Sequence, residues 1–104
     1  MDAVSVPAEL LSEAVLTWTG WGRTTWPAQD ERLVIERFGN ERAAGLLPMI
    51  RQLEDDFYRS DARFATADLA EMGDAAAAEF RIRHPEVSDA AVRALAWCYT
   101  FDYK

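Results

Sequence analysis

The sequence predicts an all-α fold, a single small domain of four to five helices packed as an irregular or orthogonal bundle. Apolar residues make up 50% of the 104 residues, which is enough to fill one core. Most of them recur every three or four positions, the spacing of one helix face. We find no internal repeat and no long linker, so residues 1–104 are expected to form one domain.

The first helix is expected from about Pro7 to Trp18. Ser5 is placed to cap it, and Pro7 is tolerated in the first turn because its missing N–H group would have no helical partner there. The residues expected to face the core are Leu10, Leu11, Ala14, Val15 and Trp18.

A loop and a short helix are expected next. Two glycines and Pro27 make the stretch up to Gln29 a loop. The short helix runs from Asp30 to Phe38, with Asp30 or Gln29 before its first turn. Gly39 ends it at a position that favours positive φ. Its inward-facing residues are Leu33, Val34 and Phe38.

The longest helix is expected from Glu41 to about Arg59, with Asn40 as its cap. Pro48 falls inside this range and removes one backbone hydrogen bond, so a kink or a split is expected there. Pro48 itself points away from the apolar stripe. That stripe consists of Ala43, Leu46, Ile50, Leu53 and Phe57.

A connector, Ser60–Ala65, precedes a further helix that Thr66 is expected to cap. This helix ends at His84 because the residue before Pro85 is pushed out of the α region. Its inward-facing residues are expected to be Leu69, Met72, Gly73, Ala76 and Phe80.

The last helix is expected from Asp89 to about Tyr99, capped by Ser88. In residues 97–103, aromatic residues alternate with others, and this period of two also suits a strand. Since no other segment reads as β, we expect the helix to fray into an extended aromatic tail that lies across the bundle.

Acidic residues dominate the charge. The chain has 18 acidic and 11 basic residues, for a net charge of −7. Residues 54–79 contain eight acidic residues and two arginines, so they supply −6 of that charge. Nucleic acid is therefore not an expected partner, because phosphate binding requires cations. The charge favours a protein partner with a basic surface, although it also serves solubility alone.

Two sets of residues are candidates for contact with such a partner. The acidic set is Glu54, Asp55, Asp56, Asp61, Glu71 and Asp74. The second set, chosen because Trp and Arg are enriched at interface hot spots, is Trp21, Arg23, Trp26 and Trp97. Each of the two sets also has a purely structural interpretation. Trp18 and Trp21 suit the ends of a small core, and Asp55 is spaced to pair with Arg51 and Arg59 on a solvated helix face.

The sequence identifies no catalytic residue, metal site or cofactor. Glu54, Asp55 and Asp56 point in directions about 100° apart on a helix, so they do not converge on one ion. His84 and Cys98 are the only histidine and cysteine, too few for a zinc site. Cys98 lies on an apolar face, where an inert buried thiol is expected. Enzymatic activity is the less favoured expectation.

The expected setting is the bacterial cytoplasm. The longest wholly apolar run, Ala75–Ala78, is far too short for a membrane span, and the first residues lack the pattern of a secretory signal. A single cysteine suits a reducing compartment. Ten arginines against one lysine, with 18 alanines, are typical of a GC-rich bacterial genome.

We therefore expect a non-enzymatic acidic protein-binding module, of the immunity-protein, antitoxin or small-regulator type, that engages a basic protein partner. Its composition is similar to that of some toxin-neutralising immunity proteins, a likeness that assigns no residue roles. One alternative is a small-molecule-binding protein or minor enzyme, with an aromatic-lined pocket in which Arg23 anchors an anionic group. The residues expected to line that pocket are Trp18, Trp21, Tyr58 and Tyr99. Another alternative is a homo-oligomer formed through the aromatic C-terminal tail.

Overall fold

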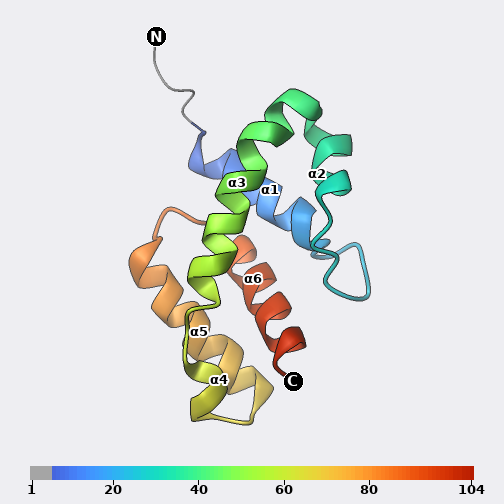
Figure 1. Ribbon diagram of the computed structural model, residues 1–104. Coiled ribbons are helices and arrows are strands. Elements are labelled where there is room, and N and C mark those ends of the chain that lie inside the picture. The colour runs from blue at the N-terminus through green and yellow to red at the C-terminus, as the bar shows by residue number, and fades with distance from the viewer. Residues whose placement is uncertain (1–5) are drawn as a thin grey trace.

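A computed structural model describes residues 6–104, and the all-α prediction is confirmed (Figure 1). The helices are α1 (Ala8–Thr19), α2 (Glu31–Phe38), α3 (Asn40–Phe57), α4 (Ala62–Ala65), α5 (Leu69–Arg83) and α6 (Asp89–Asp102). The helix α4 is a single turn within the expected connector. No helix in this part of the chain has the length and apolar character needed to cross a membrane.

Helix α3 is the longest helix, and α1, α2, α5 and α6 all pack against it (Figure 1). It contacts α1 and α2 towards one end of the molecule and α5 and α6 towards the other. Helices α5 and α6 form a hairpin, and α6 also packs along α1. The resulting body is elongated, with extents of 46 × 29 × 18 Å.

The core follows the predicted apolar stripe of α3, all of whose five residues are buried. At one end of the core, the ring of Phe57 lies 5.1 Å from that of Phe80 and 5.7 Å from that of Tyr99. The buried Tyr99 hydroxyl donates a hydrogen bond to the Ser60 carbonyl at 2.9 Å and accepts one from the Arg63 N–H group at 3.1 Å. Its polar group is therefore satisfied inside the core, as a buried hydroxyl requires.

Two of the predicted helix caps are confirmed. Asp30 accepts a hydrogen bond from the Arg32 N–H group at 2.9 Å, and Ser88 accepts one from Ala91 at 3.2 Å. The expected cap at Ser5 lies outside the described residues.

Two other predicted caps are wrong by one or two residues. The cap of α5 is Asp68, whose carboxylate accepts from the Glu71 N–H group at 3.0 Å. Thr66 instead accepts from the Asp68 N–H group at 3.1 Å, which stabilises the turn before the helix. Helix α3 begins at Asn40 itself, and Gly39 with a φ of 87° occupies the cap position.

Helix α3 runs through Pro48 without interruption, so the expected split is absent. Pro48 is exposed, and the residue four positions earlier, Ala44, is also exposed, so water can bond the carbonyl that lost its helical partner. Packing of α1, α2, α5 and α6 along α3 compensates for the missing bond.

The expected extended tail is also wrong, because α6 continues to Asp102. The Tyr103 N–H group still bonds the Tyr99 carbonyl at 3.1 Å, as in a helix. The Tyr58 hydroxyl donates to the Asp102 carboxylate at 2.5 Å, and burial and this carboxylate both raise the pKa of Tyr58. This contact fixes the last turn of α6 to α3. The extended tail through which a homo-oligomer was expected to form is therefore absent from the described residues, because these residues are helical. The oligomeric state itself stays a prediction.

The aromatic end of the core should be sensitive to truncation. Replacing the fully buried Phe57 by alanine should lower the free energy of unfolding by about 3–5 kcal/mol, because Phe80 and Tyr99 lose their packing partner. Phe64→Ala is the matched control, since Phe64 is 76% exposed and its loss should change stability by about 0.5 kcal/mol or less. Urea denaturation followed by circular dichroism measures both. Equal effects of the two substitutions would contradict this description of the core.

Candidate functional site

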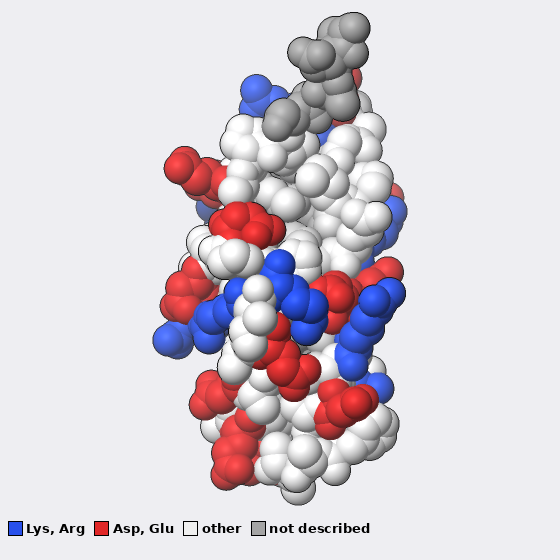
Figure 2. Space-filling view, turned by 90° about the vertical axis from the view of Figure 1, so that its left-hand side faces the viewer, with Lys and Arg blue, Asp and Glu red and all other residues white. Residues whose placement is uncertain are grey.

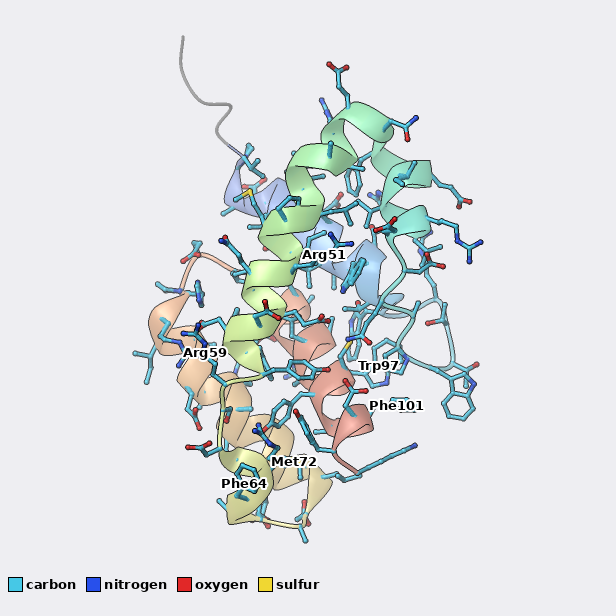
Figure 3. All side chains as sticks on the ribbon, in the orientation of Figure 1. Arg51, Arg59, Phe64, Met72, Trp97 and Phe101 are labelled. Atoms are coloured by element: carbon cyan, nitrogen blue, oxygen red, sulfur yellow. The ribbon has the colours of Figure 1, made fainter. Side chains whose placement is uncertain are left out.

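Exposed and half-buried aromatic side chains gather where the loop after α1 meets the outer face of α6 (Figure 3). The ring of Trp21 lies edge-on to that of Trp97, with the centroids 5.5 Å apart. The ring of Trp26 is tilted against that of Phe101 at 6.0 Å. We call these four residues the aromatic surface. It unites three predicted anchors, Trp21, Trp26 and Trp97, with Phe101, which was not among the predicted anchors.

The loop that carries Trp21 and Trp26 is folded back on itself by its own hydrogen bonds. Gly20 has a φ of 78°, and a side-chain carbon at this position would lie 2.4 Å from the Thr24 hydroxyl oxygen, so glycine is required. The Thr24 hydroxyl donates to the Trp26 carbonyl at 2.6 Å. The Ala28 N–H group bonds the Thr19 carbonyl at 2.8 Å and closes the loop. The tryptophans therefore protrude from a defined loop.

Glu54 of α3 anchors this loop from the other side. Its Oε2 accepts hydrogen bonds from Gln29 Nε2 at 2.6 Å and from Trp18 Nε1 at 3.3 Å. Gln29 has a φ of 47°, an uncommon value for a residue with a side chain, and the bond to Glu54 compensates for the strained backbone. Glu54, predicted to meet a partner, is thus engaged inside the protein.

A surface groove of about 320 Å³ lies between α5 and α6, beside the aromatic surface. Trp21 and Trp97 form its wall, and small residues dominate the rest of its lining: Ala70, Gly73, Ala77, Ala96 and Thr100. Gly73 sets the close approach of the two helices. A methyl group there would lie 3.2 Å from Cγ2 of Thr100. Leu69, Asp74, Arg81 and Arg93 complete the groove.

The two arginines of the groove share the carboxylate of Asp89, whereas the groove's own carboxylate, Asp74, has no such partner. Asp89 accepts from Arg81 at 2.5 Å and from Arg93 at 2.9 Å, and bonds to Arg93 and then Arg81 lower the pKa of this carboxyl. Asp74 has no ion pair with any residue in the described range, and neither does Glu71, exposed one turn earlier on α5. The groove therefore offers one carboxylate, that of Asp74, that is not engaged by a cation of the described residues.

Asp56, another predicted partner residue, holds α3 to the end of α5. Its carboxylate accepts from Arg83 Nε at 2.9 Å and lies 2.7 Å from His84 Nε2. Burial raises the pKa of Asp56, but the hydrogen bonds from Arg83 and His84 outweigh it, so the pKa lies below its ordinary value. The His84 ring also stacks on that of Phe80 at 4.5 Å. Asp56 is thus an internal ion-pair partner.

Asp55 and Asp61 are exposed and are not among the residues that line the groove. The predicted pair between Arg51 and Asp55 does not form. Arg51 instead bonds Glu31 at 2.7 Å and lies 5.8 Å above the ring of Trp18. On the face seen in Figure 2, basic side chains cross the middle of the molecule between acidic ones, so the surface there is mixed in charge. Of the six predicted acidic residues, only Asp74 lines the groove, and Glu71 lies exposed about one turn before it on α5.

Arg23 lies apart from the aromatic surface. It lines a pocket of about 410 Å³ whose other lining residues are Thr17, Gly20, Thr24, Leu33, Glu36 and Arg37. The aromatic lining expected around Arg23 is a wrong prediction. Trp18 and Tyr99 pack into the core instead, at 6% and 0% exposure. Arg37 is bonded to Glu13 at 2.8 Å.

Cys98 is fully buried, as predicted. Burial, followed by the charges of Glu54 and Asp102, raises the pKa of its thiol to about 12, so the reactive thiolate is not formed near neutral pH. In the chain from residue 6 onward, no three His, Cys, Asp or Glu side chains are grouped in a way that could hold a metal ion.

Comparisons with protein-family models, with curated proteins and with solved structures find no match for this chain. By geometry and charge, the groove and its aromatic wall are the strongest candidate. They bring together residues of the loop after α1, of α5 and of α6.

The Asp56 cluster should give the protein a specific response to acid. The pKa of Asp56 in the folded protein lies below its ordinary value of 3.8. Above pH 3.8 the charged carboxylate therefore stabilises the fold. This stabilisation is lost as the pH falls through the pKa of the folded state. Asp56→Asn should therefore cost about 1–2 kcal/mol near neutral pH, and the difference from wild type should shrink below about pH 4. Unfolding free energies measured from pH 2 to 7 test this.

Asp55→Asn is the matched control for that experiment, since Asp55 is adjacent and exposed. It should change the free energy of unfolding by less than about 0.5 kcal/mol at every pH. A difference between wild type and Asp56→Asn that persists unchanged to pH 2 would show that the charge of Asp56 is not what stabilises the fold.

Proposed function

We propose that this chain is a non-enzymatic protein-binding module that engages a partner with a basic surface through the groove between α5 and α6. The observation that carries the proposal is the convergence of Trp21, Trp97 and Asp74 on one groove. These residues come from three separate segments. Two tryptophans beside an uncompensated carboxylate are chemically suited to a segment with both apolar and basic side chains.

The aromatic surface supports this proposal because exposing it to water is unfavourable. Trp26 is 64% exposed and Trp21 is 37% exposed, although small domains usually bury tryptophan. A contiguous exposed apolar patch with a polar rim is typical of binding surfaces. Tryptophan is also among the residues that contribute most to binding when a partner covers them. A partner that covers Trp21 and Trp97 would remove this surface from water.

The distribution of charge supports a basic partner. Asp74 lines the groove and Glu71 lies about one turn before it on α5, and neither has an ion pair in the described part of the chain, whereas Arg81 and Arg93 share Asp89. The net charge of −7 attracts a cationic surface over distance and repels nucleic acid. Such long-range attraction increases the association rate more than the final affinity.

The type of binding module that we propose rests on the composition of the chain. A small acidic helical protein that binds a basic target suits the immunity-protein, antitoxin or small-regulator type, acting in the bacterial cytoplasm. In each of these roles the protein works by occupying a surface of its target, so no catalytic residue is needed.

Substitutions in the groove should reduce partner capture selectively. Wild-type protein is immobilised and exposed to a lysate of the native organism at low and then high salt, and bound proteins are identified by mass spectrometry. We expect a basic protein that elutes with salt and that Trp97→Ala captures at least about tenfold less well, as for a hot-spot tryptophan. Glu71→Gln combined with Asp74→Asn should slow its association and weaken the salt dependence.

Two control variants match these substitutions. Phe64→Ala removes an aromatic ring that is more exposed than either groove tryptophan, and Asp55→Asn removes a carboxylate outside the groove. Both should capture the same protein as wild type, and thermal melting checks that every variant is folded. Equal capture by the groove variants and the controls would refute the groove as the binding site.

A small-molecule role is the second candidate, and the pocket beside Arg23 is the observation that favours it. Arg23 has no ion pair among the residues that the structure describes, so its guanidinium is available to an anionic ligand. Glu36 on the pocket lining opposes such a ligand, and Arg37 is already paired with Glu13. We therefore rank this role below protein binding.

If the pocket binds an anionic metabolite, that compound should raise the melting temperature of the wild type but not of Arg23→Ala. At a concentration of about 100 times its dissociation constant, a ligand adds roughly 2.7 kcal/mol to the stability, which a melting scan detects easily. Arg32→Ala is the control, because Arg32 is exposed and lies outside the pocket lining. The test uses a panel of phosphorylated and carboxylated metabolites. If none of them raises the melting temperature of the wild type, binding of these compound classes is excluded.

A further inference from the structure

The outer part of the aromatic surface already holds a cation that belongs to the chain itself. Nζ of Lys104, the only lysine of the sequence, lies 4.2 Å from the ring centroid of Phe101 and 5.9 Å from that of Trp26. The negative faces of aromatic rings attract cations within about 6 Å of the centroid. Trp26 and Phe101 are 6.0 Å apart and tilted by 48°, so both rings contact one ammonium group.

The backbone segments that carry both rings are held in place by the fold. Phe101 is on the last turns of α6, one turn beyond Trp97. Trp26 is part of the loop closed by the Thr24 hydroxyl bond and anchored through Gln29 to Glu54. A preorganised pair of rings binds with less loss of conformational freedom than a flexible one.

The contacts of the Lys104 ammonium group within the described residues are those with the two rings, and a second cation in the structure provides a contrast. Arg63 stacks on Phe64 at 4.5 Å and on Tyr103 at 4.6 Å, but its guanidinium also donates to the carbonyls of Tyr58 and Ser60. Arg63 is thus a fixed part of the fold. Lys104 makes no hydrogen bond or ion pair from its ammonium group to the described residues, so another cation can displace it.

We infer that Trp26 and Phe101 form a binding site for a lysine or arginine side chain of the partner, and that Lys104 occupies this site in the free protein. The site is continuous with the groove through Trp97, so a bound basic segment reaches both. Its assignment to a partner's side chain rests on the proposed function, whereas its capacity to bind a cation does not. Lys104 then acts as an internal competitor that lowers the affinity of the free protein.

Tetramethylammonium chloride is the probe that tests the cation site without a partner. Binding is followed by the indole N–H signals of the tryptophans in two-dimensional NMR, at constant ionic strength. Lys104→Met keeps a side chain of similar length without the charge, so this variant should bind tetramethylammonium about two- to fivefold more tightly than wild type. In the Lys104→Met background, Trp26→Leu should abolish the binding.

Two controls separate this site from general effects. Arg59→Met removes an exposed positive charge at the end of α3 and should leave the affinity of the wild type unchanged (Figure 3). The neutral alcohol 3,3-dimethylbutan-1-ol has nearly the shape of the probe and should bind more weakly. Equal affinities of wild type and Lys104→Met would overturn the inference, as would equal binding of the neutral alcohol or binding that survives Trp26→Leu.

The outcomes for the cation site and for the groove are independent. If tetramethylammonium binds as expected while the groove variants capture partners as well as wild type, the proposed function fails and the cation site stands. If the groove variants lose the partner but the probe does not bind at Trp26, the cation site fails alone. If both hold, Lys104→Met should also increase the affinity for the captured basic protein.

Discussion

Two carboxylates on the last turns of α3 hold the other parts of the fold against that helix. Glu54 accepts hydrogen bonds from Trp18 and Gln29, which fixes the loop after α1. Asp56 binds Arg83 and His84, which fixes the end of α5 and therefore the hairpin with α6. Both carboxylates are partly buried, where their removal would leave polar partners unsatisfied. The relative positions of the loop and the hairpin thus depend on one short segment of α3.

The groove and the aromatic surface exist because those two parts are fixed relative to each other. Trp21 belongs to the loop and Trp97 to the hairpin, and their edge-on contact forms the wall of the groove. The close approach of α5 and α6 at Gly73 gives a shallow floor of small residues. Larger residues would fill the groove from inside. Small residues instead leave this space open at the surface, beside the rings of Trp21 and Trp97.

Helix positions were predictable because they depend on local periodicity, as the stripe of α3 illustrates. All five of its predicted residues are buried, although Pro48 interrupts the hydrogen-bond ladder. The site was predictable in its residue types but not in its arrangement. Glu54, Asp55 and Asp56 were predicted to belong to one acidic surface that meets a partner. In the structure, Glu54 and Asp56 instead accept hydrogen bonds from residues 25 to 36 positions away along the chain. Such pairs follow from tertiary packing, which no local pattern encodes.

The phase of α6 decides which aromatic residues are buried and which face solvent. An extended tail would place Trp97, Tyr99, Phe101 and Tyr103 on one side, because side chains alternate along a strand. At the helical spacing of about 100° per residue, Tyr99 points into the core, while Trp97 and Phe101 lie one turn apart on the outer face. The same spacing brings Lys104 next to Phe101. The three residues by which this helix extends beyond its predicted end at Tyr99 therefore place both Phe101 of the aromatic surface and the cation beside it.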